Sequence, residues 1–196
     1  MKKLIIMAAL VVASLNASAQ EFFLKPMAGG TVTTLTGDVP DDLKMKIGFA
    51  AGAELGYQFN DLFALTAGAI YTQQGGKVSL EGTEDSNGEK YNYSLDYLNV
   101  PILANVYVAP GLALKAGAQF GFLMRAKKGE DDIKDFYEKS DFSIPIGLSY
   151  EIDEAVIDLR YNLGISNISK SGIANIVAPK VRNSVIMLNI GYRIPF

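Results

Sequence analysis

SVIMLNIGYRIPF, residues 184–196, indicates the fold more strongly than any other stretch of the chain. Its side chains alternate between two rows, as in a β-strand, because successive side chains there point to opposite faces. One row consists of Ile186, Leu188, Ile190, Tyr192, Ile194 and Phe196, and the other of Val185, Met187, Asn189, Gly191, Arg193 and Pro195. The alternation predicts a strand with one apolar face and one more polar face.

The same stretch carries a second pattern, a polar residue followed by a glycine, an apolar residue and a final aromatic residue. The residues that match it are Asn189, Gly191, Ile194 and Phe196. Their spacing resembles the C-terminal insertion signal that the barrel-assembly machinery reads in Gram-negative bacteria. We therefore expect a β-barrel that this machinery inserts into the outer membrane.

The start of the chain has the composition of an export signal. Lys2 and Lys3 precede an apolar run at residues 4–15, and small residues follow it. The pattern predicts a signal peptide with an Ala-x-Ala site, and the residues expected around the cut are Ala17, Ala19 and Gln20. The run is shorter than the roughly twenty residues of a membrane helix, which favours cleavage over an uncleaved anchor. The expected domains are a signal peptide, 1–19, and a barrel domain, 20–196.

Period-two alternation recurs along the rest of the chain in eight segments, each about as long as a tilted membrane strand. The segments are residues 22–34, 47–59, 63–72, 93–108, 112–124, 142–152, 155–165 and 184–196. The first is irregular because Pro26, Gly29 and Gly30 interrupt it, whereas the others set an apolar row against a row rich in glycine and polar residues. The predicted fold is all-β, an eight-stranded antiparallel up-and-down transmembrane β-barrel.

The links between these segments alternate between short and long. The short links are residues 60–61, 109–111 and 153–154, and the long links are residues 35–46, 75–92, 125–141 and 166–183. Periplasmic turns of such barrels are short and extracellular loops are long, so both termini are expected in the periplasm. Aromatic residues also gather near the expected strand ends, which is typical of interfacial girdles.

The more polar rows contain charged residues that a membrane barrel has to enclose. We expect them to form one interior network, in which Glu54, Glu151 and Asp158 pair with Lys115, Arg160 and Arg193. Buried charges are costly unless they are paired, so the network is interpreted as filling rather than as a transport path. The alternative is a soluble barrel or sandwich, in which the apolar rows would point inward.

Composition argues against several classes of function. The chain has no histidine and no cysteine, which removes the usual general base, thiolate chemistry and zinc ligands. The 21 acidic residues outnumber the 18 basic residues, so nucleic acid is not expected as a partner. No catalytic residue, cofactor or metal site is predicted. Two alternatives are a carboxylate hydrolase built on Asp131, Asp132 and Asp135, and a calcium site in residues 85–89 or 130–132.

Three features together resemble one family. They are the phrase Tyr97-Leu98-Asn99-Val100-Pro101-Ile102-Leu103, the glycine-rich segment that follows it, and the terminal residues 191–196. The chain resembles the PorT-type, or porin-like, small outer-membrane barrels of Bacteroidetes. The resemblance implies residence in the outer membrane of a Gram-negative bacterium more firmly than it implies an activity.

The function expected from these observations is that of a non-enzymatic, monomeric outer-membrane barrel. It would serve as an envelope scaffold, or its loops would mediate adhesion or recognition of an extracellular ligand. Expected partners are outer-membrane lipid and lipopolysaccharide, and the barrel-assembly machinery during insertion. The alternative is a small-solute channel or, as the PorT resemblance implies, an accessory component of a protein-secretion system.

Overall fold

The computed structural model describes residues 21–38, 43–79, 90–128, 131–169 and 180–196. The predicted cleavage residues Ala17, Ala19 and Gln20 lie outside these ranges, as do the loop residues 85–89 and Glu130. The expected signal peptide and most of the two calcium alternatives therefore fall on residues that the structure does not describe.

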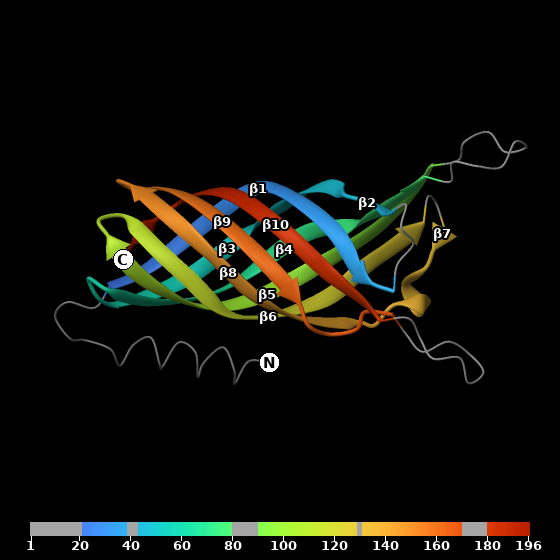
Figure 1. Ribbon diagram of the computed structural model, residues 1–196. Coiled ribbons are helices and arrows are strands. Elements are labelled where there is room, and N and C mark those ends of the chain that lie inside the picture. Colours follow the sequence, from blue (N-terminus) through green and yellow to red (C-terminus); the bar gives the residue numbers. More distant parts are fainter. Residues whose placement is uncertain (1–20, 39–42, 80–89, 129–130, 170–179) are drawn as a thin grey trace, which may run out of the picture.

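Eight long strands form a closed antiparallel barrel (Figure 1). They are β1 (Glu21–Gly37), β3 (Lys46–Asn60), β4 (Phe63–Ser79), β5 (Lys90–Ala109), β6 (Leu112–Lys128), β8 (Ser140–Ile152), β9 (Ala155–Gly164) and β10 (Val181–Tyr192). Each pairs with the next along the chain, and β10 returns to pair with β1 from Met27↔Gly191 to Gly37↔Val181. The predicted eight-stranded up-and-down barrel is confirmed.

Four short elements accompany these strands in the residues that the structure describes. β2 (Leu43–Lys44) pairs with β4, β7 (Asp131–Asp132) pairs with β6, and η1 (Lys134–Phe136) is a single 3-10 turn. β11 (Ile194–Pro195) pairs with the start of β1. The predicted last strand is therefore interrupted at Arg193. Within the described ranges, no helix is long and apolar enough to cross a membrane.

The short links and the C-terminus lie at one end of the barrel, here called the turn end, and the longer links lie at the other, the loop end (Figure 1). The tight turns are at residues 61–62, 110–111 and 153–154, which confirms two predicted positions and shifts the first by one residue. Gly111 has a φ of 73°, in the region that favours glycine. At the first turn, the side-chain oxygen of Asn60 accepts hydrogen bonds from the backbone of Leu62 and Phe63.

Strands at the loop end run further than the sequence predicted. β4 and β5 remain paired out to Ser79↔Lys90, and β6 continues to Lys128. The predicted loop boundaries at residues 75–92 and 125–141 were therefore wrong. Backbone pairing continues after the apolar alternation stops, because the hydrogen bonds of the ladder do not require apolar side chains.

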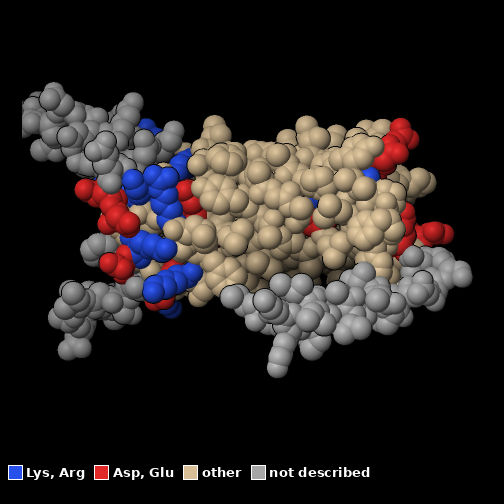
Figure 2. Space-filling model, turned by 180° about the vertical axis from the view of Figure 1, so that it is seen from behind, with Lys and Arg blue, Asp and Glu red and all other residues tan. Residues whose placement is uncertain are grey.

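The apolar rows point away from the barrel axis. Ile47 is 78% exposed and Ile190 is 69% exposed, whereas the alternate residues Ala50 and Asn189 are buried. Figure 2 shows a broad band with almost no charge at its surface between two charged ends. The alternative of a soluble barrel with inward apolar rows was therefore wrong.

Aromatic rings pair near both edges of this band. At the turn end, Tyr57 contacts Phe22 and Phe59 with ring centroids 4.7 and 4.6 Å apart, and Phe59 contacts Phe63 at 5.4 Å. Toward the loop end, Phe49 pairs with Tyr71 and Phe120 pairs with Phe142, at 5.7 and 5.2 Å. Rings in this arrangement are typical of the girdles at a membrane interface.

Candidate functional site: the filled barrel interior

Five charged side chains meet across the middle of the lumen and are here called the charge cluster. They are Lys25 of β1, Glu54 of β3, Lys115 of β6, and Asp158 and Arg160 of β9. Each side chain is 2% exposed or less. The lumen of an eight-stranded barrel is just wide enough for side chains to fill, and here charged side chains fill it.

Glu54 is at the centre of the charge cluster. Its Oε2 lies 3.2 Å from Nζ of Lys25 and 3.5 Å from Nζ of Lys115, and its Oε1 lies 2.5 Å from Nη1 of Arg160. Asp158 accepts from Arg160 through Nε at 2.5 Å and Nη2 at 2.9 Å, and it also pairs with Lys115. The ion pairs thus connect β3 with β6 and β9, which are not its neighbours in the wall.

Three cations face two carboxylates in the charge cluster. Charges in a water-free interior need both opposite charge and good hydrogen-bond geometry to offset the loss of hydration. The bidentate contact between Arg160 and Asp158 supplies that geometry. Each carboxylate contacts at least two cations, so loss of a carboxylate leaves more uncompensated charge than loss of a lysine.

Glycines in the wall make room for these long side chains. Gly68 pairs with Glu54, and a Cβ at position 68 would come within 2.7 Å of Cγ of Glu54. Gly147 lies between Lys115 and Arg160, its partners on the two adjacent strands. A glycine beside a large inward side chain keeps a narrow barrel from being overfilled.

A second group of polar side chains closes the turn end and is here called the end cluster. Its members are Glu21, Gln58, Tyr107, Glu151 and Arg193. Nη1 of Arg193 lies 3.0 Å from Oε2 of Glu151 and donates to the hydroxyl of Tyr107 at 3.2 Å. Its Nη2 reaches Oε1 of Gln58 at 3.2 Å and Oε2 of Glu21 at 3.4 Å.

A phenylalanine lies next to both clusters. The guanidinium of Arg193 stacks over the ring of Phe23, 4.0 Å from its centroid. Phe23 is buried, and it lies two residues before Lys25 on the inward side of β1. The ring is therefore an apolar layer between the end cluster and the charge cluster.

The six residues predicted to form one network thus lie in two groups. Glu54, Lys115, Asp158 and Arg160 meet in the charge cluster, whereas Glu151 and Arg193 meet in the end cluster. The sequence analysis missed Lys25, because Pro26 made the first segment look irregular. The signal was present, since Lys25 alternates with outward-facing Leu24 and Pro26 and therefore has the inward position.

The loop-end half of the lumen is closed by apolar residues. Met27, Ala50, Ile70 and Met187 form one buried cluster directly beyond the charge cluster. A second buried cluster, the apolar cap, consists of Leu35, Leu95, Tyr97, Leu123, Ala126 and Ile168. Tyr137, which lies between η1 and β8, packs against the apolar cap, and burial raises the pKa of its hydroxyl.

The residues of the predicted insertion signal occupy different positions in the wall. Asn189 is fully buried and faces the lumen, and Gly191 pairs with Met27. Ile194 and Phe196 are exposed on the outer surface. The backbone N–H of Phe196 donates to the carbonyl of Phe22 at 2.9 Å, which fixes the C-terminus to β1.

The three aspartates considered for a carboxylate hydrolase lie on the surface of the loop end. Asp131, Asp132 and Asp135 are exposed. In the part of the chain that the structure describes, no group of three or more acidic side chains is placed to hold a metal ion. The geometry therefore gives no support to the carboxylate hydrolase.

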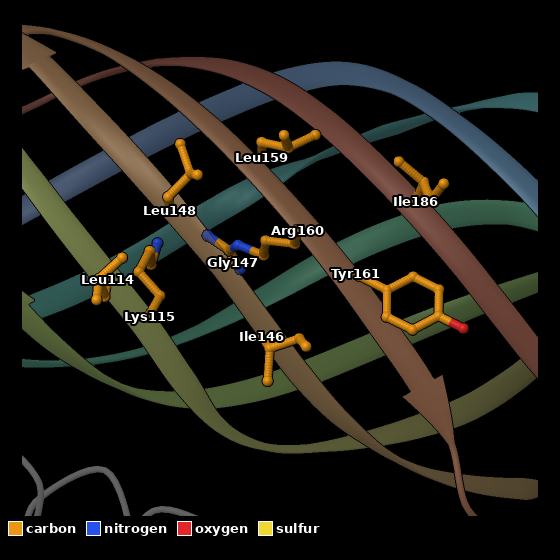
Figure 3. Close-up of a pocket in the computed structure, with 9 residues that line it drawn as sticks. All are labelled: Leu114, Lys115, Ile146, Gly147, Leu148, Leu159, Arg160, Tyr161 and Ile186. Atoms are coloured by element: carbon orange, nitrogen blue, oxygen red, sulfur yellow. The ribbon is translucent and has the colours of Figure 1, made fainter.

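The outer wall has an apolar hollow of about 580 Å³, shown in Figure 3. Its lining residues are Leu114, Lys115, Ile146, Gly147, Leu148, Leu159, Arg160, Tyr161 and Ile186. Lys115 and Arg160 direct their side chains into the lumen and Gly147 has none, so backbone forms the floor and apolar side chains form the rim. The hollow therefore lies on the outer face of the wall, at the same strand positions from which Lys115 and Arg160 extend into the lumen.

Comparison with known proteins bears on this geometry. A family model described as "Outer membrane protein beta-barrel domain" matches residues 18–170. Neisserial surface protein A (NspA) is similar in structure, with a TM-score of 0.55 and 17% identity over 88% of this chain and 97% of that chain. Ail, the attachment invasion locus protein of Yersinia pestis, has a TM-score of 0.53 and 18% identity over 89% and 99%. A search of curated proteins finds no match.

Proposed function

The chain belongs to the outer-membrane protein family that this β-barrel domain defines, and we propose that it is a closed, non-enzymatic barrel that acts at its loop end rather than through its lumen. Its role would be that of an envelope scaffold or of a surface for adhesion and recognition. The charge cluster is the observation that carries the proposal, because it joins non-neighbouring strands across the lumen.

Closure does not depend on the charge cluster alone. From the turn end inward, the end cluster, the ring of Phe23, the charge cluster and the apolar residues around Ile70 follow one another. The apolar cap then fills the loop end. A hydrated solute would have to displace ion pairs and apolar layers in turn, which argues against the small-solute channel.

The loop end offers a surface for anionic lipid. Exposed basic residues there are Lys44, Arg125, Lys139, Lys180 and Arg182. Figure 2 shows basic side chains next to the uncharged band at this end, with acidic side chains beyond them. Arginine and lysine pair well with phosphate, so we assign the loop end to the cell exterior, in contact with lipopolysaccharide, and both termini to the periplasm.

Conductance across a planar bilayer tests the closed lumen. The protein as it exists is expected to give no steady stepwise current, because the end cluster, the charge cluster and the apolar cap each block the lumen. Arg160→Ala removes one of the two side chains that join Glu54 to Asp158, and it is expected to raise leakage only to the extent that the charge cluster, and not the layers on either side of it, closes the lumen. Steady, uniform current steps from the unaltered protein would contradict the proposal and favour the channel.

The PorT resemblance supplies a second candidate, an accessory component of a protein-secretion system. The phrase that carries the resemblance, residues 97–103, lies in β5, and its Tyr97 is part of the apolar cap. A strain that lacks the protein would then secrete an altered set of proteins. An unchanged set of secreted proteins would contradict the secretion role and favour the role as envelope scaffold or recognition surface.

A further inference from the structure

A polar chamber lies in the lumen between the apolar cluster around Ile70 and the apolar cap. Its lining residues are Gln74, Gln119, Asp141, Ser143, Asn162, Asn183 and Val185, contributed by β4, β6, β8, β9 and β10. On β10, Met187 separates Val185 of the chamber from Asn189, and on β4 the inward positions run from Gly68 through Ile70 to Gln74. The chamber is therefore distinct from the charge cluster.

Asp141 is the charged residue of the polar chamber, and its partners are neutral. It is 7% exposed. Its Oδ1 accepts from the hydroxyl of Ser166 at 2.6 Å, and its Oδ2 accepts from Nδ2 of Asn183 at 2.9 Å. Over the described ranges, Asp141 forms no ion pair with a lysine or arginine. A buried carboxylate without a counter-ion is strongly unfavourable.

Three amide side chains that line the same chamber have polar atoms without partners among the described residues. Oε1 of Gln74, Oε1 of Gln119 and both polar side-chain atoms of Asn162 are buried and form no hydrogen bond with any residue that the structure describes. The amide nitrogens of the two glutamines are already used, since Gln74 donates to Thr72 at 2.8 Å and Gln119 donates to Ser143 at 3.1 Å. Each glutamine therefore uses one N–H of its amide nitrogen, and its amide oxygen lacks a partner among the described residues.

The carboxylate of Asp141 and the unpaired amide oxygens would be stabilised by a bound cation. Carboxylate and amide oxygens are the ligands that hard cations prefer. The gaps between the lining side chains are too narrow for a whole water molecule, which favours a bare small ion over a hydrated one. One carboxylate balances one positive charge, whereas a divalent ion would leave buried charge in excess.

We propose that the polar chamber binds a small monovalent cation, with sodium as the probe, through Asp141, Gln74, Gln119 and Asn162. The bound ion joins β4 to β6, β8 and β9 and neutralises the carboxylate. It stabilises the loop-end half of the barrel, and this role is separate from any recognition by the loops.

Sodium titration of the folded full-length barrel in a zwitterionic detergent tests the site. Sodium chloride replaces choline chloride at constant ionic strength, and the readouts are the sodium-23 NMR line width and urea-induced unfolding. The sodium line is expected to broaden in the presence of the protein. With sodium at about ten times its dissociation constant, mass action lowers the equilibrium constant for unfolding about tenfold.

Two matched substitutions identify the carboxylate that binds the ion. Asp141→Asn keeps the shape of the side chain and is expected to abolish both sodium effects. Asp96→Asn is the control, because Asp96 is likewise a buried carboxylate with a neutral partner, the hydroxyl of Tyr71, but does not line the chamber. Its sodium response is expected to match that of the unaltered protein. A heat-dependent shift on a denaturing gel checks that each variant is folded.

Three results would overturn the inference. They are equal behaviour of the unaltered protein in sodium and choline, a sodium response that survives in folded Asp141→Asn, and a larger stabilisation by calcium than by sodium at the same ionic strength. Equal behaviour in sodium and choline would mean that the chamber binds no sodium ion. A response that survives in Asp141→Asn would mean that sodium binds at another site. Stronger stabilisation by calcium would mean that the bound ion is not monovalent. None of them depends on the conductance experiment.

Discussion

The charge cluster and the end cluster contain the same kinds of ion pair, and they differ in their access to water. Glu54 and Arg160 have no exposed side-chain surface, whereas the side chains of Arg193 and Glu151 are 15% and 12% exposed. Glu21, which also contacts Arg193, is 48% exposed. The pair distances of the two clusters overlap, with 3.2 and 3.5 Å from Glu54 to the lysines and 3.0 and 3.4 Å at Arg193, so distance by itself does not indicate how much each pair contributes.

The physical difference lies in what remains when one partner is removed. In the charge cluster, the remaining charges cannot be rehydrated, so removal costs far more than the intact pair contributed. At the end cluster, water reaches the freed group, and the expected cost is that of a surface ion pair. The comparison predicts that one chemical change has different effects in the two places.

Glu54→Gln is expected to have the largest effect. It leaves Lys25, Lys115 and Arg160 facing Asp158 alone, in a region closed to water. The free energy of unfolding in detergent should fall by about 3 to 5 kcal/mol, the usual cost of breaking a buried pair. Urea titration followed by the heat-dependent gel shift measures it. A loss below about 1 kcal/mol would mean that water reaches the charge cluster.

Lys115→Met is expected to have an intermediate effect. The change removes two contacts, to Glu54 and Asp158, but leaves two cations facing two carboxylates. We expect a loss on the order of 2 kcal/mol, smaller than that of Glu54→Gln, from the same urea titration. If Lys115→Met were less stable than Glu54→Gln, the excess of cations over carboxylates would not determine the loss of stability.

Glu151→Gln is expected to have the smallest effect and is the matched control for Glu54→Gln. Arg193 keeps Tyr107, Gln58 and Glu21 as partners, and water can take the remaining position. The expected loss is below about 1 kcal/mol and should shrink further in high salt. Equal losses for the two glutamine variants would remove the distinction between the clusters.

The barrel wall was predictable because its signal is local. Apolar alternation identified the eight strands, and the short links identified the turn end, since both depend on residues close together in the chain. The exact residues at which the strands end on the loop side could not be predicted. Pairing of Ser79 with Lys90 depends on hydrogen bonds between backbones, and these carry no signature in hydrophobicity.

For the interior, the sequence predicted which charged residues point inward but not which of them form ion pairs. Alternation placed Glu54, Lys115, Glu151, Asp158, Arg160 and Arg193 on inward faces, yet it could not state which of them would meet. Lys25 was missed because Pro26 and two glycines disturbed the pattern of the first segment. The position of Asp141 among neutral partners could not be predicted from the sequence, because those partners come from other segments of the chain.

The amino-acid sequence by itself determined that this chain builds a barrel with apolar rows outward and charged residues inward, because the direction of a side chain in a strand follows from its position. Tertiary structure alone decided the partners. Strand tilt and register bring Lys25, Lys115 and Arg160 around Glu54, and they leave Asp141 among amides. Contacts across a lumen depend on the geometry of the closed sheet, which no single strand contains.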